Sequence, residues 1–524
     1  MSSIKKRTFE LGSWTLISRF LGLFREILLV KILGASALSD AFLSAYKLPN
    51  TLRKTFAEGA MSISMVPTIT KLINSDDKKT AESLMTVAFL FFETLVALIC
   101  IFGAIYAPQI LRLLQPGFSQ ETIDFATSYL RLLIPMIFFL SSSYLITAAL
   151  HSVQHFRIPA LGPIILNIFY LTGIGLAYLL NRFFNVPMVT AINFICIFLL
   201  AGVATQLVIQ IHTYFKYGFE FGPITFKAIN AFKTVLWMFI PSMIGAGLLE
   251  LNFVVDTYFA SYLPTGSVSL ITYANRFMGI PVGVFASSFA TILLPSFSKT
   301  AVKEPEKFGF LLTEATKLVL WVTIPAMFIF FFFSNQIFAT LYVSQKFSVD
   351  QALQTSNVFK AFLIGTTVFS LNKILLTIYY SKHKNFVPTI ISVFATALNA
   401  LLNFLLMKSY GAVGLALATT LSQFAETTSL LLILHLIFKI SLDIRKVLLF
   451  TIKILLQVLT GIILFILAYS ALEYAMMLIP TGAWHTFFFH KMGYWFWAGP
   501  LSVVFALFIL QSRKFFHIDL HFME

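Results

Sequence analysis

Long apolar segments follow one another along the whole chain, and they restrict the fold more than any other feature. A bilayer offers the backbone no hydrogen-bond partners, so a crossing segment must be a helix or part of a closed barrel. A crossing helix needs about 20 mostly apolar residues. Only 11% of the residues are charged, against about 25% in soluble domains. We therefore predict an all-α polytopic membrane protein with fourteen transmembrane helices, at residues 8–34, 40–70, 81–107, 121–153, 159–181, 186–216, 225–262, 266–300, 309–342, 353–381, 385–408, 411–438, 446–475 and 491–512.

The basic residues between these segments lie mostly on one side. Groups such as 5–7, 299–307 and 439–446 stand at the N-terminus or after even-numbered segments, whereas connections after odd-numbered segments hold single cations such as Arg112 and Arg182. Because Lys and Arg favour the cytoplasmic side, both termini are predicted to be cytoplasmic. This arrangement accounts for the net charge of +15 without nucleic acid as a partner. We expect one sizeable external loop, at residues 475–490.

A weak internal repeat divides the chain into two halves. VPTITK at 66–71 resembles LPSFSK at 294–299, and Pro67, Phe118 and Pro159 have counterparts 228 to 229 positions later. Six predicted helices separate the copies, so both halves have the same orientation and are related by an axis along the membrane normal, as in many transporters. We predict two pseudo-symmetric six-helix lobes, residues 1–220 and 221–440, around a central cavity, with two extra helices in 441–524.

Arginines interrupt the apolar segments of both halves. Arg19, Arg25 and Arg53 lie in the first two segments, and Arg276 lies in the eighth. A charge in the middle of a bilayer costs roughly 2.5–3.5 kcal/mol, and arginine suits bidentate contact with phosphate. This pattern predicts a cationic cavity for a phosphorylated substrate. The alternatives are snorkelling to the headgroups and, for Arg25, local neutralisation by Glu26.

Oxygen-bearing residues form a second polar set in the seventh, eleventh and twelfth segments. Asp256 lies deep in the seventh, Asn399 and Asn403 share one helix face, and Thr419 follows in the twelfth. Such a set suits a hard cation, whereas interhelical hydrogen bonding is the simpler alternative. The sequence contains no HExxH motif, nucleophile elbow or phosphate loop. We therefore do not expect an enzyme or a catalytic residue.

Three stretches resemble the MurJ/MviN family of lipid II flippases. They are RFLGLFRE at 19–26, DAFLSAYKLPNTLRKTFAEGAMSISMVP at 40–67, and YANRFMGIPVGV…ILLPSFSK at 273–299. The resemblance covers nearly the whole chain, and the second stretch is the most specific. It implies fourteen helices, two lobes around a V-shaped cavity, and a groove beside the last two helices for a lipid tail. The MurJ/MviN family belongs to a superfamily that also contains multidrug exporters and polysaccharide flippases.

The resemblance also implies which residues bind. The substrate-binding positions of the family correspond here to Arg19, Arg25, Glu26, Asp40, Asn50, Arg53, Glu58, Ser269 and Arg276. The sodium site of some members corresponds to Asp256, Asn399, Asn403, Thr419 and the Leu415 carbonyl. Three positions depart from the family pattern: Asn403 replaces a carboxylate, which argues against sodium, Glu26 replaces an aspartate, and Gly279 replaces a glutamate.

The resemblance implies that the function is movement of lipid II, an undecaprenyl pyrophosphate carrying the disaccharide-pentapeptide, from the cytoplasmic to the outer leaflet of the bacterial inner membrane; the two predicted lobes suggest alternating access. No cofactor is expected. Sodium or the membrane potential, worth about 2.3 kcal/mol per charge per 100 mV, would drive transport. Membrane lipids are further partners, and a cell-wall synthesis complex is left open. The alternative is a flippase for another prenyl-diphosphate-linked glycan. A multidrug exporter would need an acidic cavity, and a prenyl-phosphate enzyme a carboxylate cluster.

Overall fold

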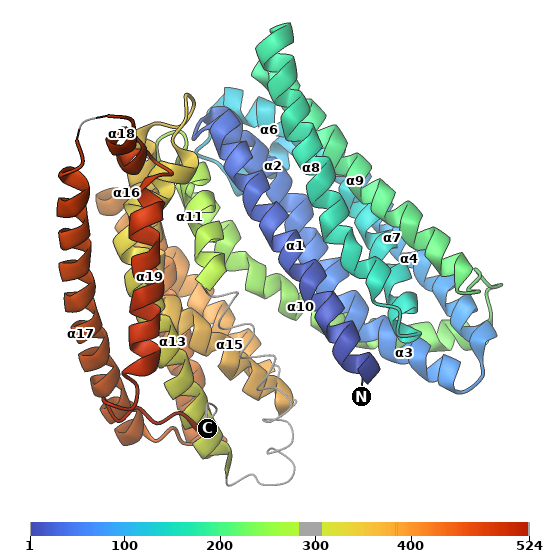
Figure 1. Cartoon of the computed structure of the whole chain (residues 1–524). Helices are drawn as coiled ribbons and strands as arrows, with labels where there is room; N and C mark the ends of the chain where they lie inside the picture. The colour runs from blue at the N-terminus through green and yellow to red at the C-terminus, as the bar shows by residue number, and fades with distance from the viewer. Residues whose placement is uncertain (1, 282–306, 383, 385, 481, 522–524) are drawn as a thin grey trace. The chain divides into compact units, whose positions relative to one another are not determined.

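The described part of the chain is built from helices and contains no strand (Figure 1). The computed structural model describes all residues except 1, 282–306, 383, 385, 481 and 522–524. The side chains of some helical residues, Glu58 among them, also lie outside the description. The prediction of an all-α fold is confirmed.

The chain separates into two compact units. Unit 1 comprises Met1–Ser269 with Ser344–Phe347, and unit 2 comprises Leu270–Val343 with Ser348–Glu524. The boundary falls at Ser269, within the first turn of a helix, rather than in a connection. The division into lobes 1–220 and 221–440 with the extra segment 441–524 stays a prediction.

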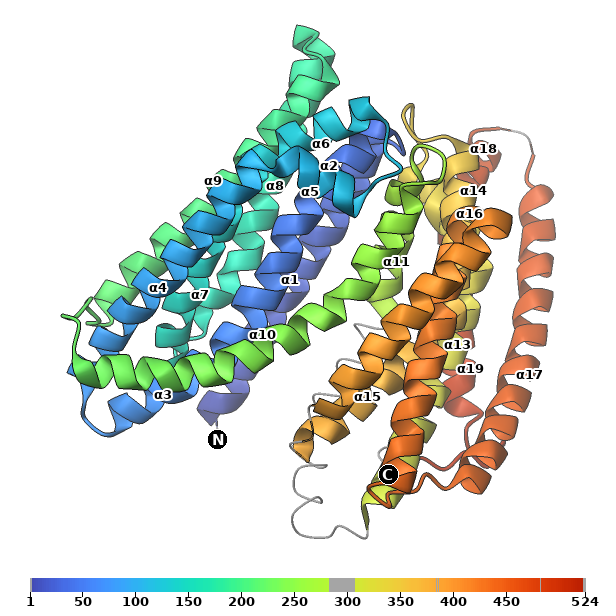
Figure 2. The same cartoon turned by 180° about the vertical axis from the view of Figure 1, so that it is seen from behind.

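Unit 1 holds the first eleven helical elements, and the long helices α8 and α9 run side by side in both views (Figures 1 and 2). The elements are α1 (Ser2–Leu33), α2 (Ala37–Leu52), η1 (Arg53–Met61), α3 (Ser62–Asn74), α4 (Lys78–Ile105), α5 (Ala107–Leu114), α6 (Gln120–Leu133), α7 (Met136–Ser152), α8 (Arg157–Phe184), α9 (Met188–Lys216) and α10 (Phe226–Ala260).

The close contact of α8 and α9 depends on small residues. A Cβ atom at Gly173 would lie 2.9 Å from Cβ of Phe198 and 3.1 Å from Cα of Ile195. Association of helices in a membrane relies on packing rather than on the hydrophobic effect, so small residues that let backbones approach contribute directly.

The predicted second membrane helix is built from three segments instead of one. Ser36 begins α2 with a capping box in which it exchanges hydrogen bonds with Ser39. Pro49 lies inside α2, and the π-helix η1 begins four residues later at Arg53. Proline cannot donate the backbone hydrogen bond of a regular helix, and π-segments are frequent at functional sites. This irregular region carries several of the predicted binding residues.

Unit 2 contains the remaining elements. They are α11 (Ser267–Pro281, whose first turn belongs to unit 1), α13 (Phe308–Tyr342), α14 (Val349–Ile364), α15 (Thr366–Ser381), α16 (Phe386–Leu436), α17 (Ile444–Met477), α18 (Ala483–Phe489) and α19 (Tyr494–Gln511). Helix α16 covers two predicted membrane helices, which meet at Gly411, where φ is 54° and ψ is −134°. Helix α18 lies where the sequence predicts an external loop.

Helices α17 and α19 pack on α13 within unit 2 (Figures 1 and 2). Their contact is a buried aromatic cluster that includes Phe333 of α13, Phe465 of α17, and Trp497 and Phe505 of α19. Phe465 stacks edge-on against Phe333 and Phe505, with ring centroids 5.8 and 5.9 Å apart. The two C-terminal helices outside the internal repeat are therefore integral parts of unit 2.

Eight helices of the described residues are long and apolar enough to cross a membrane, or nine if α14 and α15, bent by 47°, form one span. Each predicted membrane segment is mostly helix over its described residues, and parts of the eighth and eleventh segments lie outside the described residues. Elements such as α1 and α2 carry the charged residues that define the predicted site, and they are less apolar for that reason. The number of fourteen crossings stays a prediction.

Candidate functional site

Asp40 and Ser269, two of the predicted binding residues, are in direct contact. The Asp40 carboxylate accepts hydrogen bonds from the backbone N–H of Gly266 at 2.6 Å, the backbone N–H of Ser269 at 2.8 Å and the Ser269 hydroxyl at 2.6 Å. The Ser269 and Ser39 hydroxyl oxygens are 2.8 Å apart. A carboxylate is favourable at the N-terminus of a helix, where backbone N–H groups are unpaired. Asp40 therefore fixes the first turn of α11 against α2.

Arg25 is held on α1 by three neighbours. Its guanidinium donates to the Asn167 side-chain oxygen at 2.7 Å, stacks 4.7 Å from the centre of the Tyr170 ring, and lies 3.9 Å from the Glu26 carboxylate. Glu26 is buried. The local neutralisation considered for Arg25 thus has a structural basis, although the 3.9 Å separation is a loose ion pair. The Nε–H of Arg25 makes no hydrogen bond within the described residues.

Arg53 and Asn50 are also brought together. The Arg53 Nε–H donates to the Asn50 side-chain oxygen at 3.1 Å, and a terminal N–H donates to the Tyr144 hydroxyl of α7 at 3.2 Å. Arg53 is the first residue of η1, and Asn50 lies in the last turn of α2. The change from α- to π-helix therefore orients this guanidinium.

Two lysines of the same region contact α10. The Lys47 ammonium donates to the Thr257 hydroxyl at 2.8 Å and to the Phe253 carbonyl, and it lies 3.7 Å from the centre of the Phe253 ring. Lys54 forms an ion pair with Glu250 at 3.0 Å. Both lysines are therefore held by residues of α10 within unit 1.

The other predicted binding residues do not join these contacts. Arg19 is exposed on α1. Arg276 is half-buried on α11 in unit 2, where it interacts electrostatically with Tyr342. The Glu58 side chain lies outside the described residues. The predicted assembly of arginines from both halves into one cavity therefore stays a prediction.

The polar residues of α16 form a connected set. Asn403 donates to the Asn399 oxygen at 3.1 Å, Asn399 donates to the Thr419 hydroxyl at 3.3 Å, and that hydroxyl donates to the Leu415 carbonyl at 3.0 Å. Asp256 is buried on α10 in unit 1. The two amide nitrogens are directed at the Thr419 and Asn399 side-chain oxygens, and the sodium site stays a prediction. The described residues contain no group of three or more His, Cys, Asp or Glu that could hold a metal ion.

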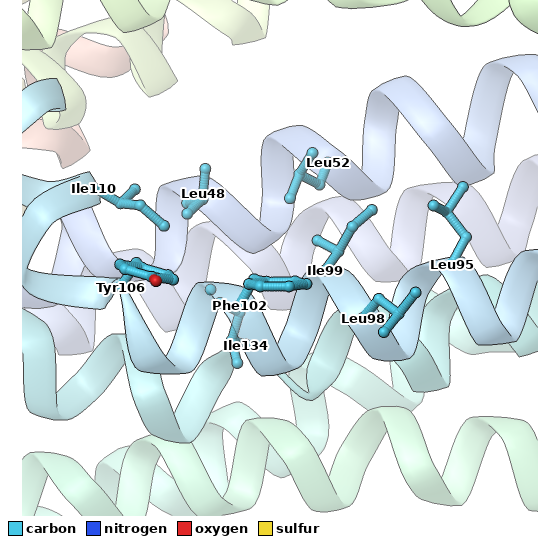
Figure 3. A pocket seen from close by; sticks show the side chains of 10 residues that line it. Leu48, Leu52, Leu95, Leu98, Ile99, Phe102, Tyr106, Ile110 and Ile134 are labelled. Atoms are coloured by element: carbon cyan, nitrogen blue, oxygen red, sulfur yellow. The ribbon is translucent and has the colours of Figure 1, made fainter.

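An apolar cavity of about 530 Å³ lies elsewhere in unit 1, between α2, α4 and α5 (Figure 3). None of the predicted binding residues lines it. Its walls include Leu48, Leu52, Leu95, Phe102, Ile110 and Ile134. Walls of this kind suit a hydrocarbon group and would exclude a phosphate.

A family model described as "Lipid II flippase MurJ" matches residues 29–484. The chain belongs to the MurJ family. This match spans the contacts of Asp40, Lys47, Arg53 and the α16 set, whereas Arg25, Glu26 and the α19 residues of the aromatic cluster lie outside it.

Sequence relatives agree with the MurJ assignment. The chain is 31% identical to the "Probable lipid II flippase MurJ" of Buchnera aphidicola subsp. Schizaphis graminum over 425 residues, which cover 80% of this chain and 81% of the relative.

Solved structures agree as well. The structure titled "Lipid II flippase MurJ, inward closed conformation" matches with a TM-score of 0.77 and 25% identity, over 97% of this chain and 98% of the other. A multidrug resistance MATE family transporter of the MOP superfamily, in an inward-facing conformation, matches with a TM-score of 0.67 and 13% identity, over 79% of this chain and 93% of the other. The second likeness concerns the fold alone.

Sequence reasoning missed several contacting residues of this MurJ-family chain. Asn167 and Tyr144 lie in apolar helices, and no spacing distinguishes them from the other polar residues of those helices. Lys47 offered a signal, because it lies in the same charged stretch as Arg53. Its partner Thr257, more than 200 positions away, becomes evident only when α10 is placed beside α2.

Proposed function

We propose that this chain flips lipid II, moving the lipid-linked peptidoglycan precursor from the cytoplasmic to the outer leaflet of the bacterial inner membrane. The observation that carries the proposal is the match to the MurJ family over residues 29–484. It favours lipid II over another prenyl-diphosphate-linked glycan, because the curated relatives bear the lipid II name. The chain acts as a membrane transporter, and we propose that no covalent reaction accompanies the movement.

We propose that Arg25 and Arg53 bind the diphosphate of the substrate, together with Arg19 and Arg276. Neighbours already orient two of these guanidinium groups, Arg25 through Asn167 and Tyr170 and Arg53 through Asn50 and Tyr144. An oriented fork of donors loses little conformational entropy when it binds phosphate. Its charge also acts more strongly in a low-dielectric surrounding than in water.

The Asp40–Ser269 contact is proposed to open during transport. If both termini are cytoplasmic, as the basic connections predict, the start of α2 lies toward the outer face. Asp40 would then hold the first turn of α11 while the outer side is closed. Release of the sugar-peptide head to the outer side would require these hydrogen bonds to break and re-form in every cycle.

The energy source is proposed to be the membrane potential or sodium. A net charge that moves with the substrate gains about 2.3 kcal/mol per 100 mV. The α16 set of Asn399, Asn403, Leu415 and Thr419 would offer all its oxygens to sodium only after its amides reorient, since Asn403 now donates to Asn399 and Asn399 donates to Thr419. Potential-driven movement needs no such change and is the version we favour. Membership of a cell-wall synthesis complex is a separate proposal that a pull-down would test.

The decisive test measures lipid II at the outer leaflet of cells depleted of this protein. Wild type or Arg25→Ala is restored from a plasmid, and the membrane level of each is checked. We expect outer-leaflet lipid II to fall on depletion and to return with wild type but not with Arg25→Ala. Unchanged outer-leaflet lipid II, with another prenyl-linked glycan accumulating inside, would show that the substrate is different.

A further inference from the structure

A buried acidic residue lies outside every contact described above. Glu93 stands near the middle of α4, one of the helices long and apolar enough to cross a membrane, and it is only 5% exposed. Acidic residues within transmembrane helices are costly to bury, and they usually mark proton or ion pathways when they lie inside a bundle. The motifs of the sequence gave no reason to single out Glu93.

The polar partners of Glu93 include hydroxyl groups of α7. Ser141 and Ser142 interact with its carboxyl group, and they are 1% and 0% exposed. Neither carboxyl oxygen and neither hydroxyl meets hydrogen-bond geometry with a described residue. We call these three side chains the Glu93 cluster. The two hydroxyls are uncharged and can donate to the carboxyl group or accept from it, so a buried carboxylate beside them has no compensating charge.

No positive charge neutralises the cluster. Glu93 forms no ion pair in the part of the chain that the structure describes. On the α10 side, α4 meets the rings of Phe232 and Phe239, which pack against Phe92 with centroids 5.7 and 4.7 Å apart. On α4 itself, the titratable group that interacts with Glu93 is the thiol of Cys100.

The cations of neighbouring elements lie near the helix ends or, like Lys233 of α10, are exposed. Lys227 of α10 is 3.7 Å from Asp77, directly before α4. Arg131 of α6 donates to the carbonyl of Ala104, close to the last residue of α4. Lys71, the basic residue of α3, lies in the last turn of that helix. The middle of α4 therefore has no fixed counter-ion, and a proton is the simplest means of neutralising Glu93.

We propose that the Glu93 cluster is a proton-binding site inside the membrane, and that it releases and rebinds its proton during the transport cycle. In the bound state the carboxylic acid O–H donates to Ser141 or Ser142. On release that O–H bond breaks, the proton passes to water that reaches the cluster, and a carboxylate remains. Hard metal cations usually take six or more oxygens, whereas the cluster offers four, so a proton fits better.

Helix α7 gives this site a connection to the substrate. Tyr144, which accepts a hydrogen bond from Arg53, follows Ser141 and Ser142 within one turn of the same helix. A shift of α7 on binding of diphosphate at Arg53 would also move the two hydroxyls relative to Glu93. This coupling rests on the proposed function, whereas proton binding by itself does not.

The first experiment reads the proton directly and needs no substrate. Infrared spectra of the full-length protein in lipid bilayers near neutral pH are compared for wild type, Glu93→Gln and Glu121→Gln, where Glu121 is exposed on α6. We expect the C=O band of a protonated carboxylic acid to disappear in Glu93→Gln and to persist in Glu121→Gln. A wild-type spectrum from which Glu93→Gln removes only carboxylate bands would overturn the proposal.

Two additions keep this experiment decisive. If Glu93→Gln does not fold, a Ser141→Ala/Ser142→Ala variant replaces it, and its acid band should shift because the hydrogen-bond acceptors are gone.

Thermal stability is also measured with sodium and with choline. A sodium-induced rise in melting temperature that Glu93→Gln abolishes would show that the cluster binds a metal ion and would refute a proton site.

The second experiment tests coupling, with lipid II flipping in proteoliposomes as a function of pH. We expect wild type and Glu121→Gln to share one pH dependence and Glu93→Gln to lose it. An unchanged pH dependence in Glu93→Gln would remove the coupling from the proposal. Failure of the wild type to flip lipid II, with the acid band present, would count against the proposed function and leave the proton site standing.

Discussion

At the scale of single residues, the environment separates arginines that the sequence treats alike. Arg53 is held by Asn50 and Tyr144, Arg25 by Asn167 and Tyr170, and Arg19 is exposed. A guanidinium held in place has already lost most of its rotational freedom, so binding phosphate costs it less entropy. The held arginines should therefore contribute more to binding than the exposed one.

The Arg53 fork gives a prediction for substrate binding. Arg53→Lys keeps the charge but cannot contact Asn50 and the substrate with a planar fork, and Arg53→Ala loses both. Hydrogen bonds to charged groups contribute about 1.5–3 kcal/mol, so we expect Arg53→Ala to weaken lipid II binding roughly tenfold to hundredfold, with Arg53→Lys between it and wild type. Affinity for purified lipid II checks this.

The matched control for Arg53 is Arg112→Ala, an exposed arginine bonded to Gln120 at 2.6 Å. It should bind lipid II like the wild type. Equal loss in both variants would show that total charge, rather than the position of Arg53, determines binding.

At the scale of elements, backbone geometry determines where helices turn. Gly34 joins α1 to α2 with a φ of +68°, and a Cβ atom there would lie 2.0 Å from the Lys346 carbonyl oxygen, also in unit 1. Only glycine satisfies both conditions without strain. The turn that leads into the α2–η1–α3 region thus depends on one residue without a side chain.

Substitution of this glycine should be destabilising. Left-handed backbone costs an L-residue roughly 1–2 kcal/mol, and the clash with the carbonyl adds to it. We expect Gly34→Ala to unfold at a lower temperature than the wild type in detergent. The control is Gly175→Ala on α8, where a Cβ atom meets nothing within 4 Å and alanine favours the helix. Equal melting temperatures for the two variants would contradict the prediction.

The start of α17 should respond to acid. Asp443 accepts a hydrogen bond from the backbone N–H of Lys446 at 3.0 Å, and this bond, with the Lys446 ammonium 3.1 Å away, holds the pKa of Asp443 below 3.8. A carboxyl whose pKa is lower in the folded state contributes stability above its unfolded pKa, and this is lost as the pH falls through the folded value. The cap should therefore persist at neutral pH and weaken below 3.8.

Hydrogen exchange at the Lys446 amide measures that loss. We expect Asp443→Ala to speed exchange there at neutral pH, and wild type, corrected for the intrinsic pH dependence, to lose protection in acid. Asp443→Asn retains an acceptor oxygen that does not titrate, so its protection should be the same at both pH values. Acid loss of the same size in Asp443→Asn would place the sensitive group elsewhere.

At the scale of the whole molecule, alternating access requires contacts that break in each cycle. The Asp40–Ser269 contact is made by three short hydrogen bonds. Such bonds contribute about 1.5–3 kcal/mol each with a charged acceptor, which a transport cycle can supply. The contact is therefore strong enough to hold one state and weak enough to open.

A reversible cross-link tests whether it opens. The Ser39 and Ser269 hydroxyl oxygens are 2.8 Å apart, so Ser39→Cys/Ser269→Cys should form a disulfide, in a background where Cys100 and Cys196 are replaced. We expect oxidation to stop lipid II flipping and a reductant to restore it, while Ser39→Cys alone is insensitive to oxidation. Normal flipping by fully oxidised double mutant would exclude opening at this contact.

The sequence by itself determined the helical fold, the placement of the helices and the family. Apolar length and the spacing of basic residues are local properties, and each segment must satisfy its own backbone hydrogen bonds in a membrane. The motifs around Arg25, Asp40 and Arg53 are also local, because each is a continuous stretch of the chain. They therefore identified the family without the tertiary structure. The family match and the related structures confirm that part of the prediction.

Only the tertiary structure decided which of these residues meet. Asp40 and Ser269 are 229 positions apart, and Lys47 and Thr257 are 210 apart. The π-helix that begins at Arg53 and the serines beside Glu93 likewise have no continuous signature, because packing between helices selects them. Hydrogen bonds and ion pairs act over a few ångströms in space, so the chemistry of this chain depends on which helix faces lie together.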